Sequence, residues 1–283
     1  TGLQFTLVTT LLKSFYYKDS ANLYISLASI PAICDIDNDG DVDILVSNVQ
    51  GGYMEFHKNE SMEKTGSCGE LLFKMQDPCW GKFMANPFSN SATLGVSCKG
   101  AIASKETHDE AHSGYTMLMF DMEGDGDKDL LIGDVIATNL LMLTNGGSPS
   151  EAKMTAQDKN FPSNTVPVNL ISFPAAYLLD VDNDSKKDLL VAPNAPNVSD
   201  NHKGILWYKN TGTDSSIVFT YKQNAFLQDQ MIDVGEGAYP VFFDYNSDSL
   251  MDIVIGNYGY STAGGTYKSM LGLYKNTGTK TFP

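Results

Sequence analysis

A nine-residue acidic segment occurs four times in this chain, and it limits the possible folds more than any other feature. The copies start at Asp35, Asp121, Asp180 and Asp244, and each has oxygen-bearing side chains at positions 1, 3, 5 and 9. Position 7 varies, as expected of a residue that binds metal through its backbone carbonyl. Calcium takes roughly six to eight oxygen ligands, so we predict about four structural Ca²⁺ ions, one in each loop. The predicted ligands are Asp35, Asp37, Asp39, Asp41 and Asp43 in loop 1, Asp121, Glu123, Asp125, Asp127 and Asp129 in loop 2, Asp180, Asp182, Asp184, Lys186 and Asp188 in loop 3, and Asp244, Asn246, Asp248, Leu250 and Asp252 in loop 4.

The residues after each loop exclude an EF-hand, which needs a Glu at position 12 and a departing helix. Position 12 is Val46, Ile132, Val191 or Ile255 here. The following runs are short and β-branched, and apolar runs also precede the loops, so each loop is expected to join two strands. The Asp at position 9 is then expected to close the metal site.

A second repeated feature is an Asn within a turn-forming sequence, at Asn59, Asn145, Asn210 and Asn276. The repeating unit is therefore strand, acidic loop, two strands, Asn turn and strand. The loops start 86, 59 and 64 residues apart. This period predicts an all-β chain, a β-propeller built from four-stranded blades. We expect blades at about 24–110, 111–170, 171–230 and 231–283, and a trailing strand of a preceding blade within 1–10.

The four units resemble FG-GAP/VCBS repeats, the blades of integrin α-subunit-like propellers, whose motif reads Asp-x-Asp-x-Asp-Gly-x-x-Asp between apolar strands. Ser185 and Ser249 stand where that family prefers Gly. The resemblance implies calcium-binding blades, commonly seven, so we expect an arc of a larger propeller. Alternatively, a strand near Phe5 to Val8 closes a four-bladed ring.

Two short segments, Cys79–Gly81 and Val234–Asp244, also resemble secreted Bacteroidota proteins that carry type IX secretion sorting domains. This resemblance implies an extracellular or cell-surface location. It also implies that further blades or domains of the same full-length chain are its partners.

The charge of the chain argues against a nucleic-acid partner, and its hydropathy argues against a transmembrane segment. The chain has 34 acidic and 19 basic residues, and the four loops hold half of the acidic ones. Nucleic acid is an unexpected partner, because binding it needs a basic stripe. No apolar run reaches about 18 residues, so no transmembrane segment is expected.

The long first spacing indicates an inserted Cys-containing loop, which we place at Ser61–Gly100. It holds Cys68, Cys79 and Cys98, whereas Cys34 lies in an apolar run before loop 1. Four cysteines allow three pairings, and we favour a disulfide within the insertion that leaves Cys34 reduced. Such a disulfide suits an oxidising exterior.

Evidence for catalysis is weak. His108 and His112 imitate a zinc-protease helix, but Asp109 stands where that motif needs Glu. Trp80, Phe83 and Phe88 form either a sugar-stacking platform or a small core beneath the insertion. We therefore expect no enzyme activity from this chain.

The first functional hypothesis is a calcium-stabilised adhesion module that binds a protein or glycan ligand on a cell or matrix surface. The alternative is an accessory propeller of a secreted polysaccharide-degrading enzyme. Binding is expected at the insertion and at the connections 194–204 and 258–267.

Overall fold

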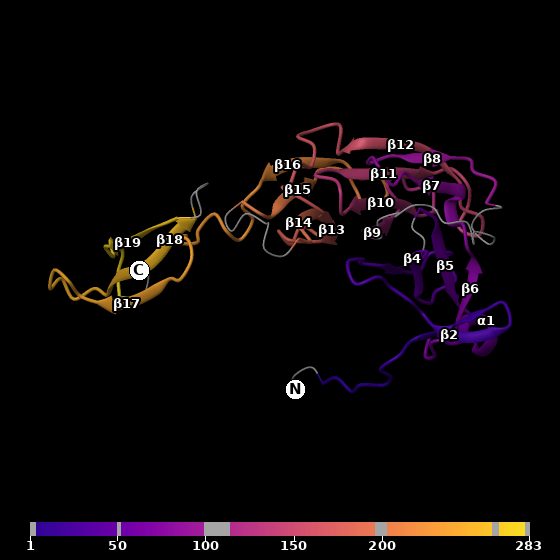
Figure 1. The fold of residues 1–283 in the computed structure, drawn as a ribbon, viewed down its shortest axis with the longest axis horizontal. Coiled ribbons are helices and arrows are strands. Elements are labelled where there is room, and N and C mark those ends of the chain that lie inside the picture. The colour runs from indigo at the N-terminus through magenta and orange to yellow at the C-terminus, as the bar shows by residue number, and fades with distance from the viewer. Residues whose placement is uncertain (1–3, 50–51, 99–113, 196–202, 262–265, 281–283) are drawn as a thin grey trace. The chain divides into compact units, whose positions relative to one another are not determined.

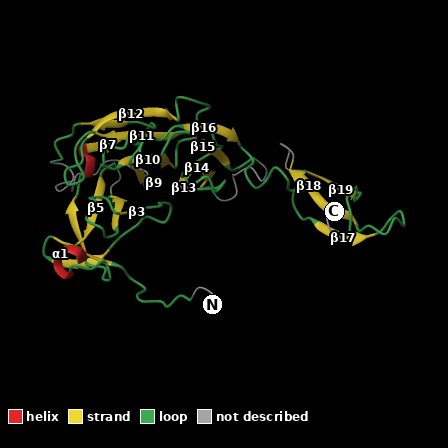
Figure 2. Cartoon of the chain, turned by 180° about the vertical axis from the view of Figure 1, so that it is seen from behind, coloured by secondary structure: helices red, strands yellow, loops and turns green. Residues whose placement is uncertain are grey.

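The structure is a computed structural model that describes residues 4–49, 52–98, 114–195, 203–261 and 266–280. The chain divides into two compact units, Thr1–Phe226 and Leu227–Pro283. Strands make up nearly all of the regular structure in the described residues, as Figure 2 shows in yellow. The prediction of an all-β chain with four-stranded, blade-type sheets is confirmed.

The first unit contains three such sheets, each built from strands that follow one another in the sequence (Figure 1). All sequential neighbours pair antiparallel, so each sheet is a meander. The strands are β3 (Ala32–Cys34), β4 (Asp43–Ser47), β5 (Met54–Asn59) and β6 (Phe73–Asp77) in blade 1, β9 (Tyr115–Phe120), β10 (Asp129–Asp134), β11 (Leu140–Asn145) and β12 (Met154–Phe161) in blade 2, and β13 (Pro174–Leu179), β14 (Asp188–Pro193), β15 (Leu206–Asn210) and β16 (Phe219–Gln223) in blade 3.

The second unit contains the fourth sheet, in which three strands are described: β17 (Tyr239–Phe243), β18 (Asp252–Ser261) and β19 (Tyr267–Tyr274). The long β18–β19 hairpin includes Tyr258 and Tyr267. The binding connection expected at 258–267 therefore consists partly of paired strand. Residues 262–265 of that prediction, and 196–202 of the other connection, lie outside the described residues.

All four acidic loops have the same register between their flanking strands. In each blade the Asp at position 9 pairs with the residue just before position 1: Cys34 with Asp43, Phe120 with Asp129, Leu179 with Asp188 and Phe243 with Asp252. The expected strand, loop, strand unit is thus formed four times with identical geometry.

Blades 1, 2 and 3 contact one another through their first strands. Strand β9 lies between β3 and β13. A parallel bridge joins Ile30 to Thr116, and the Thr116 hydroxyl donates to the Pro174 carbonyl at 2.6 Å. Contact between first strands is the arrangement of neighbouring propeller blades around an axis.

Side-chain alternation explains why the runs after the loops are continuously apolar. Successive strand residues point to opposite faces. On β10, Leu130 and Ile132 join the core shared with blade 1, whereas Leu131 joins the core shared with blade 3. Blade 2 therefore buries both faces, which a half-exposed sheet with alternating polar residues would not do.

A hairpin absent from the sequence predictions enlarges blade 1. Strands β1 (Lys13–Tyr16) and β2 (Asp19–Asn22) pair with each other, and β1 joins β6 in parallel. The buried Ser14 hydroxyl and His57 Nδ1 are 2.8 Å apart, which fastens β1 to β5. Residues 4–12 contain no strand. The strand expected within 1–10 is therefore not found in the described part of that range.

About half of the described residues of the predicted insertion at Ser61–Gly100 form helix or strand rather than a loop. It contains helix α1 (Ser61–Thr65), strand β6, the short 3₁₀ helix η1 (Trp80–Lys82) and a hairpin of β7 (Phe83–Ala85) and β8 (Ala92–Leu94). Strand β6 is the fourth strand of blade 1, so only the part after it is added to the blade. A disulfide joins Cys79 to Cys98, and Cys34 and Cys68 are free. The prediction of a bond within the insertion is confirmed.

The β7–β8 hairpin lies against the outer strand of blade 2. Ala92 and Gln157 exchange two hydrogen bonds of 3.0 and 3.1 Å, and Lys82 pairs with Glu151 at 2.5 Å. Trp80 and Phe83 are buried in the core between blades 1 and 2, whereas Phe88 is exposed. The small-core interpretation of the first two aromatics is correct, and they cannot form a sugar platform.

Candidate metal centre

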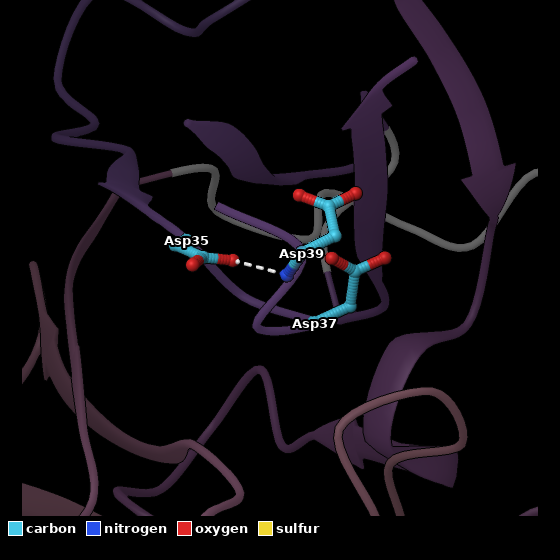
Figure 3. Close-up of side chains that lie close together, drawn as sticks. All are labelled: Asp35, Asp37 and Asp39. Atoms are coloured by element: carbon cyan, nitrogen blue, oxygen red, sulfur yellow. Dashed lines mark hydrogen bonds between the residues drawn. The ribbon is translucent and has the colours of Figure 1, made fainter. Parts of the chain in front are cut away.

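Each acidic loop is organised by the carboxylate at position 1. In all four copies it accepts the backbone N–H groups of positions 5 and 6, over 2.7–3.2 Å. The position 5 carboxylate then accepts the N–H of position 7, over 2.9–3.1 Å. These bonds fold the loop back on itself and bring alternate side chains to one side. Figure 3 shows the result in loop 1, with the dashed line marking the Asp39 N–H donating to Asp35.

The fold of the loop requires a left-handed backbone at positions 4 and 6. Their φ angles are positive in all four copies: Asn38 and Gly40, Gly124 and Gly126, Asn183 and Ser185, and Ser247 and Ser249. Glycine adopts this region freely, and Asn tolerates it better than most other residues. Ser185, Ser247 and Ser249 therefore keep the common geometry in spite of a steric cost.

Loop 1 has the densest group of carboxylates. Asp35, Asp37 and Asp39 can each place one oxygen within 4.8 Å of the others, and Asp39, Asp41 and Glu63 form a second such group. Glu63 comes from helix α1 and was not among the sequence-predicted ligands. The Oδ2 atom of Asp41 accepts hydrogen bonds from the Ser61 hydroxyl at 2.9 Å and the Met62 N–H at 3.0 Å. Position 7 is thus a buried anchor in this loop.

Loop 3 repeats the first of these groups. Asp180, Asp182 and Asp184 can place one oxygen each within 4.8 Å of one another. In loop 4, the Asn246 amide donates to Asp248 at 2.9 Å, so its amide and carboxylate also lie side by side.

Loop 2 has five acidic residues and a buried carboxylate oxygen without a partner. Asp127 is only 4% exposed, and its Oδ1 has no hydrogen-bond partner among the described residues. Asp41 at the same position of loop 1 is 2% exposed and has the same unpartnered oxygen. A buried ionised oxygen is costly unless a donor or cation meets it. These two atoms point to a cation in their loops, although in loop 2 no three acidic side chains among the described residues place oxygens within 4.8 Å of one another.

The Asp at position 9, which the sequence predicts as a metal ligand, also holds backbone N–H groups of its own blade. All four are buried, and Asp43, Asp129 and Asp252 accept the N–H of position 2 on one oxygen. Asp188 instead accepts the Trp207 indole N–H. The other oxygen accepts the N–H of the turn Asn of the same blade at 2.8 Å: Asn59, Asn145, Asn210 or Asn276. Position 9 therefore ties the loop to the far end of the third strand.

The turn Asn continues this connection into the blade edge. The Asn145 Oδ1 accepts the N–H groups of Gly147 and Lys153, and Asn210 does the same for Gly212 and Val218. From the sequence, these Asn residues were predicted only to form turns. Their constant pairing with position 9 was visible as a repeated order but not as a contact.

Burial and like charge raise the pKa of several loop carboxyls. Burial raises the pKa of Asp43 to about 7, although two backbone N–H donors oppose it. Burial also raises the pKa of Asp129 to about 7, and the nearby Glu123 carboxylate adds to the shift. Burial, together with the charges of Asp125, Glu123 and Asp121, raises the pKa of Asp127 to about 6. A divalent cation would relieve this repulsion.

Three lysines, missed by the sequence analysis, point into the loops. Lys58 Nζ contacts Asp37, lies 2.8 Å from Asp39 and lies 2.5 Å from Glu63. Lys209 contacts Asp182 and lies 2.9 Å from Asp184, and Lys275 is 3.8 Å from Asp248. Hydrogen bonds to Asp182 and Asp184 raise the pKa of Lys209. Burial opposes ionisation of Asp39, but Lys58 and the Asp41 N–H outweigh it and lower the pKa of Asp39. Each lysine directly precedes a turn Asn, which is a signal the sequence contained.

A cavity of about 460 Å³ lies where blades 1, 2 and 3 meet, beside the first residues of loops 1 and 2. Its polar lining includes Asp35, Asp121, Lys128, Lys187 and Asp214, and its apolar lining includes Leu118, Phe120, Leu178 and Ile217. This volume and mixture are usual for a small-ligand site. Cys34 also lines it, and burial raises the pKa of this thiol to about 11, so it is a poor nucleophile at neutral pH.

His108, Asp109 and His112, the residues that imitate a zinc-protease helix, lie outside the described residues. None of the helices in the described part of the chain has the length and apolar character needed to cross a bilayer.

Comparison with known proteins gives little beyond this geometry. The sequence matches no protein-family model, and no curated protein matches it. Among solved structures, a lectin of Agrocybe aegerita, described as specifically recognising non-reducing terminal N-acetylglucosamine, is similar at 12% identity and a TM-score of 0.32. The alignment covers 87% of this chain and 51% of the lectin chain, so this chain spans about half of the lectin's length.

Proposed function

We propose that the chain is a calcium-stabilised, non-catalytic propeller module of an extracellular protein, which binds a protein or glycan ligand. The observation that supports it is the fourfold loop geometry. The same backbone hydrogen bonds, left-handed positions and strand register recur in every copy, although the intervening sequences differ. Repetition of a strained, densely charged loop is expected where a cation offsets its cost.

The calcium in this proposal is structural. Each loop joins the first two strands of its blade, and position 9 links the loop to the third strand. A bound ion would therefore hold three strands of one blade together. The side-chain oxygens at positions 1, 3 and 5, all carboxylates except the Asn246 amide, would hold the ion, with Asp41 and Asp127 as additional ligands in loops 1 and 2.

The cavity between blades 1, 2 and 3 is the surface to which we assign ligand binding. It has both charged and apolar walls on a rigid, two-sided core, which suits recognition of a polar ligand with hydroxyl groups. It replaces the insertion as the preferred site, because Trp80 and Phe83, the insertion aromatics that could have stacked on a sugar, are buried in the core.

The test is binding to a glycan array by the calcium-loaded chain, the metal-free chain and two variants. Leu178→Trp fills the cavity, whereas Val166→Trp adds the same side chain at an exposed loop position outside the cavity. We expect glycan binding by the calcium-loaded chain and by Val166→Trp, and loss of binding by Leu178→Trp. Equal binding by both variants would contradict the assignment to the cavity. Cleavage of the arrayed glycans by the purified chain would contradict the non-catalytic proposal.

A further inference from the structure

The four acidic loops differ in one respect that their shared geometry hides. The residue before the turn Asn is a lysine in blades 1, 3 and 4, namely Lys58, Lys209 and Lys275, and it is Thr144 in blade 2. Position 9 holds the turn Asn of each blade through the same hydrogen bond, so we expect Thr144 to face loop 2 as the three lysines face their loops. The lysine side chain is long enough to reach the acidic group, and the contacts show that it does.

The lysines occupy the carboxylates that a metal ion would need. Lys58 and Lys209 each contact the acids at positions 3 and 5 of their loop, and Lys275 faces position 5. Lys58 is further held by Glu63 of helix α1. An ammonium group in this place neutralises part of the charge that attracts calcium, and it must move away or share ligands when calcium binds.

Loop 2 has no such counterion among the described residues. No ion pair involves Glu123, Asp125 or Asp127 in the described part of the chain. The adjacent Lys128 donates instead to Asn38 of loop 1 at 2.9 Å. The unpartnered oxygen of Asp127, on a residue that is only 4% exposed, is a second observation that points to a cation here.

We propose that Lys58, Lys209 and Lys275 are built-in competitors of calcium, so that loop 2 fills first and the other three loops fill at higher calcium concentrations. The proposal rests on the proposed function, because it assumes that the loops bind calcium. It changes the order expected from charge alone, in which loops 1 and 2 would be equally tight because both carry an acid at position 7. The chain would then respond to calcium in two stages, since charge balance tunes calcium affinity over orders of magnitude.

The test is calorimetric titration of Ca²⁺ into the metal-free full chain. Asp125→Asn should remove the tightest binding step. Thr144→Lys places a competitor in loop 2 and should weaken that step about tenfold or more, whereas Thr144→Met, of similar length and no charge, should leave it nearly unchanged. Lys58→Met should add a second tight site, whereas Lys159→Met removes the same charge from an exposed position on β12 and should add none.

The outcomes separate the two proposals. Absence of calcium binding by the unaltered chain would overturn both. Calcium binding with the same affinities in the unaltered chain and in Thr144→Lys would overturn the competition and leave structural calcium intact. If Lys58→Met fails to fold without metal, Thr144→Lys and Thr144→Met still decide, because they alter a half-buried residue at the end of a strand.

Discussion

The Asp at position 9 should stabilise the fold even without calcium, and Asp129 is the best place to test this. Its two oxygens accept the Met122 and Asn145 N–H groups, both at 2.8 Å, and the residue is 1% exposed. A hydrogen bond to a charged group contributes about 1.5–3 kcal/mol, and an orphaned buried N–H costs about 1–3 kcal/mol. The truncation also removes the cost of burying the Asp129 charge and its repulsion with Glu123, and this relief offsets part of the loss. We therefore expect Asp129→Ala to lower the free energy of unfolding by about 3–5 kcal/mol in calcium-free buffer.

The assay is urea unfolding at pH 8 followed by tryptophan fluorescence. Both tryptophans, Trp80 and Trp207, lie in the first unit, so the signal reports the unit that contains Asp129. Asp125→Ala is the matched control, because Asp125 is exposed and accepts only the Asp127 N–H; we expect a loss below about 1 kcal/mol. If Asp129→Ala were as stable as the unaltered chain without calcium, and less stable than it only with calcium, position 9 would act as a metal ligand alone.

Three further predictions concern the first unit. The pKa values of Asp43 and Asp129 in the folded state, about 7, lie above the ordinary aspartate value of 3.8, so the metal-free chain should lose stability as pH rises from about 4 to about 7. Saturating calcium should abolish the loss, and urea unfolding at a series of pH values checks both statements. Gly133→Ala should destabilise the contact of β10 with blade 3 by about 1–3 kcal/mol or more, because the added Cβ would lie 1.7 Å from the Pro174 carbonyl oxygen. Gly69→Ala is the control and should be nearly neutral, and thermal unfolding of the two variants tests this. Cys79→Ser should lower the free energy of unfolding by about 3 kcal/mol, because it removes a disulfide between residues 19 positions apart. Cys68→Ser, at a free cysteine, is the control and should leave the melting temperature unchanged. Equal melting temperatures for both variants would show that the β7–β8 hairpin is held by packing alone.

Local features of this fold could be predicted from the sequence, because each is determined by residues close together in the chain. The strands on both sides of the loops follow from the apolar runs, and the loop boundaries follow from the acidic pattern. The left-handed positions explain why Gly or Asn usually occupies positions 4 and 6. A disulfide within the insertion was predicted because three of the four cysteines fall there, but the sequence did not show which two of them pair.

The features that the sequence did not predict depend on contacts between distant residues. The hairpin Lys13–Asn22 lies outside the repeating unit, and it is held by the pairing of β1 with β6 and by the contact of Ser14 with His57, 43 residues away. The role of position 9 could not be separated from metal binding, because its partner Asn lies 16 to 24 residues away, at the end of another strand. The insertion was interpreted as a loop because β7 and β8 are only three residues long.

The most direct test of the central claim is the number of calcium ions that the chain binds. The metal-free chain would be titrated with Ca²⁺ by calorimetry, with the quadruple variant Asp35→Asn, Asp121→Asn, Asp180→Asn and Asp244→Asn as the control that alters the organising carboxylate of every loop. The account predicts about four ions per chain, the first bound more tightly than the rest, and none in the control. Fewer than two ions per chain would contradict it.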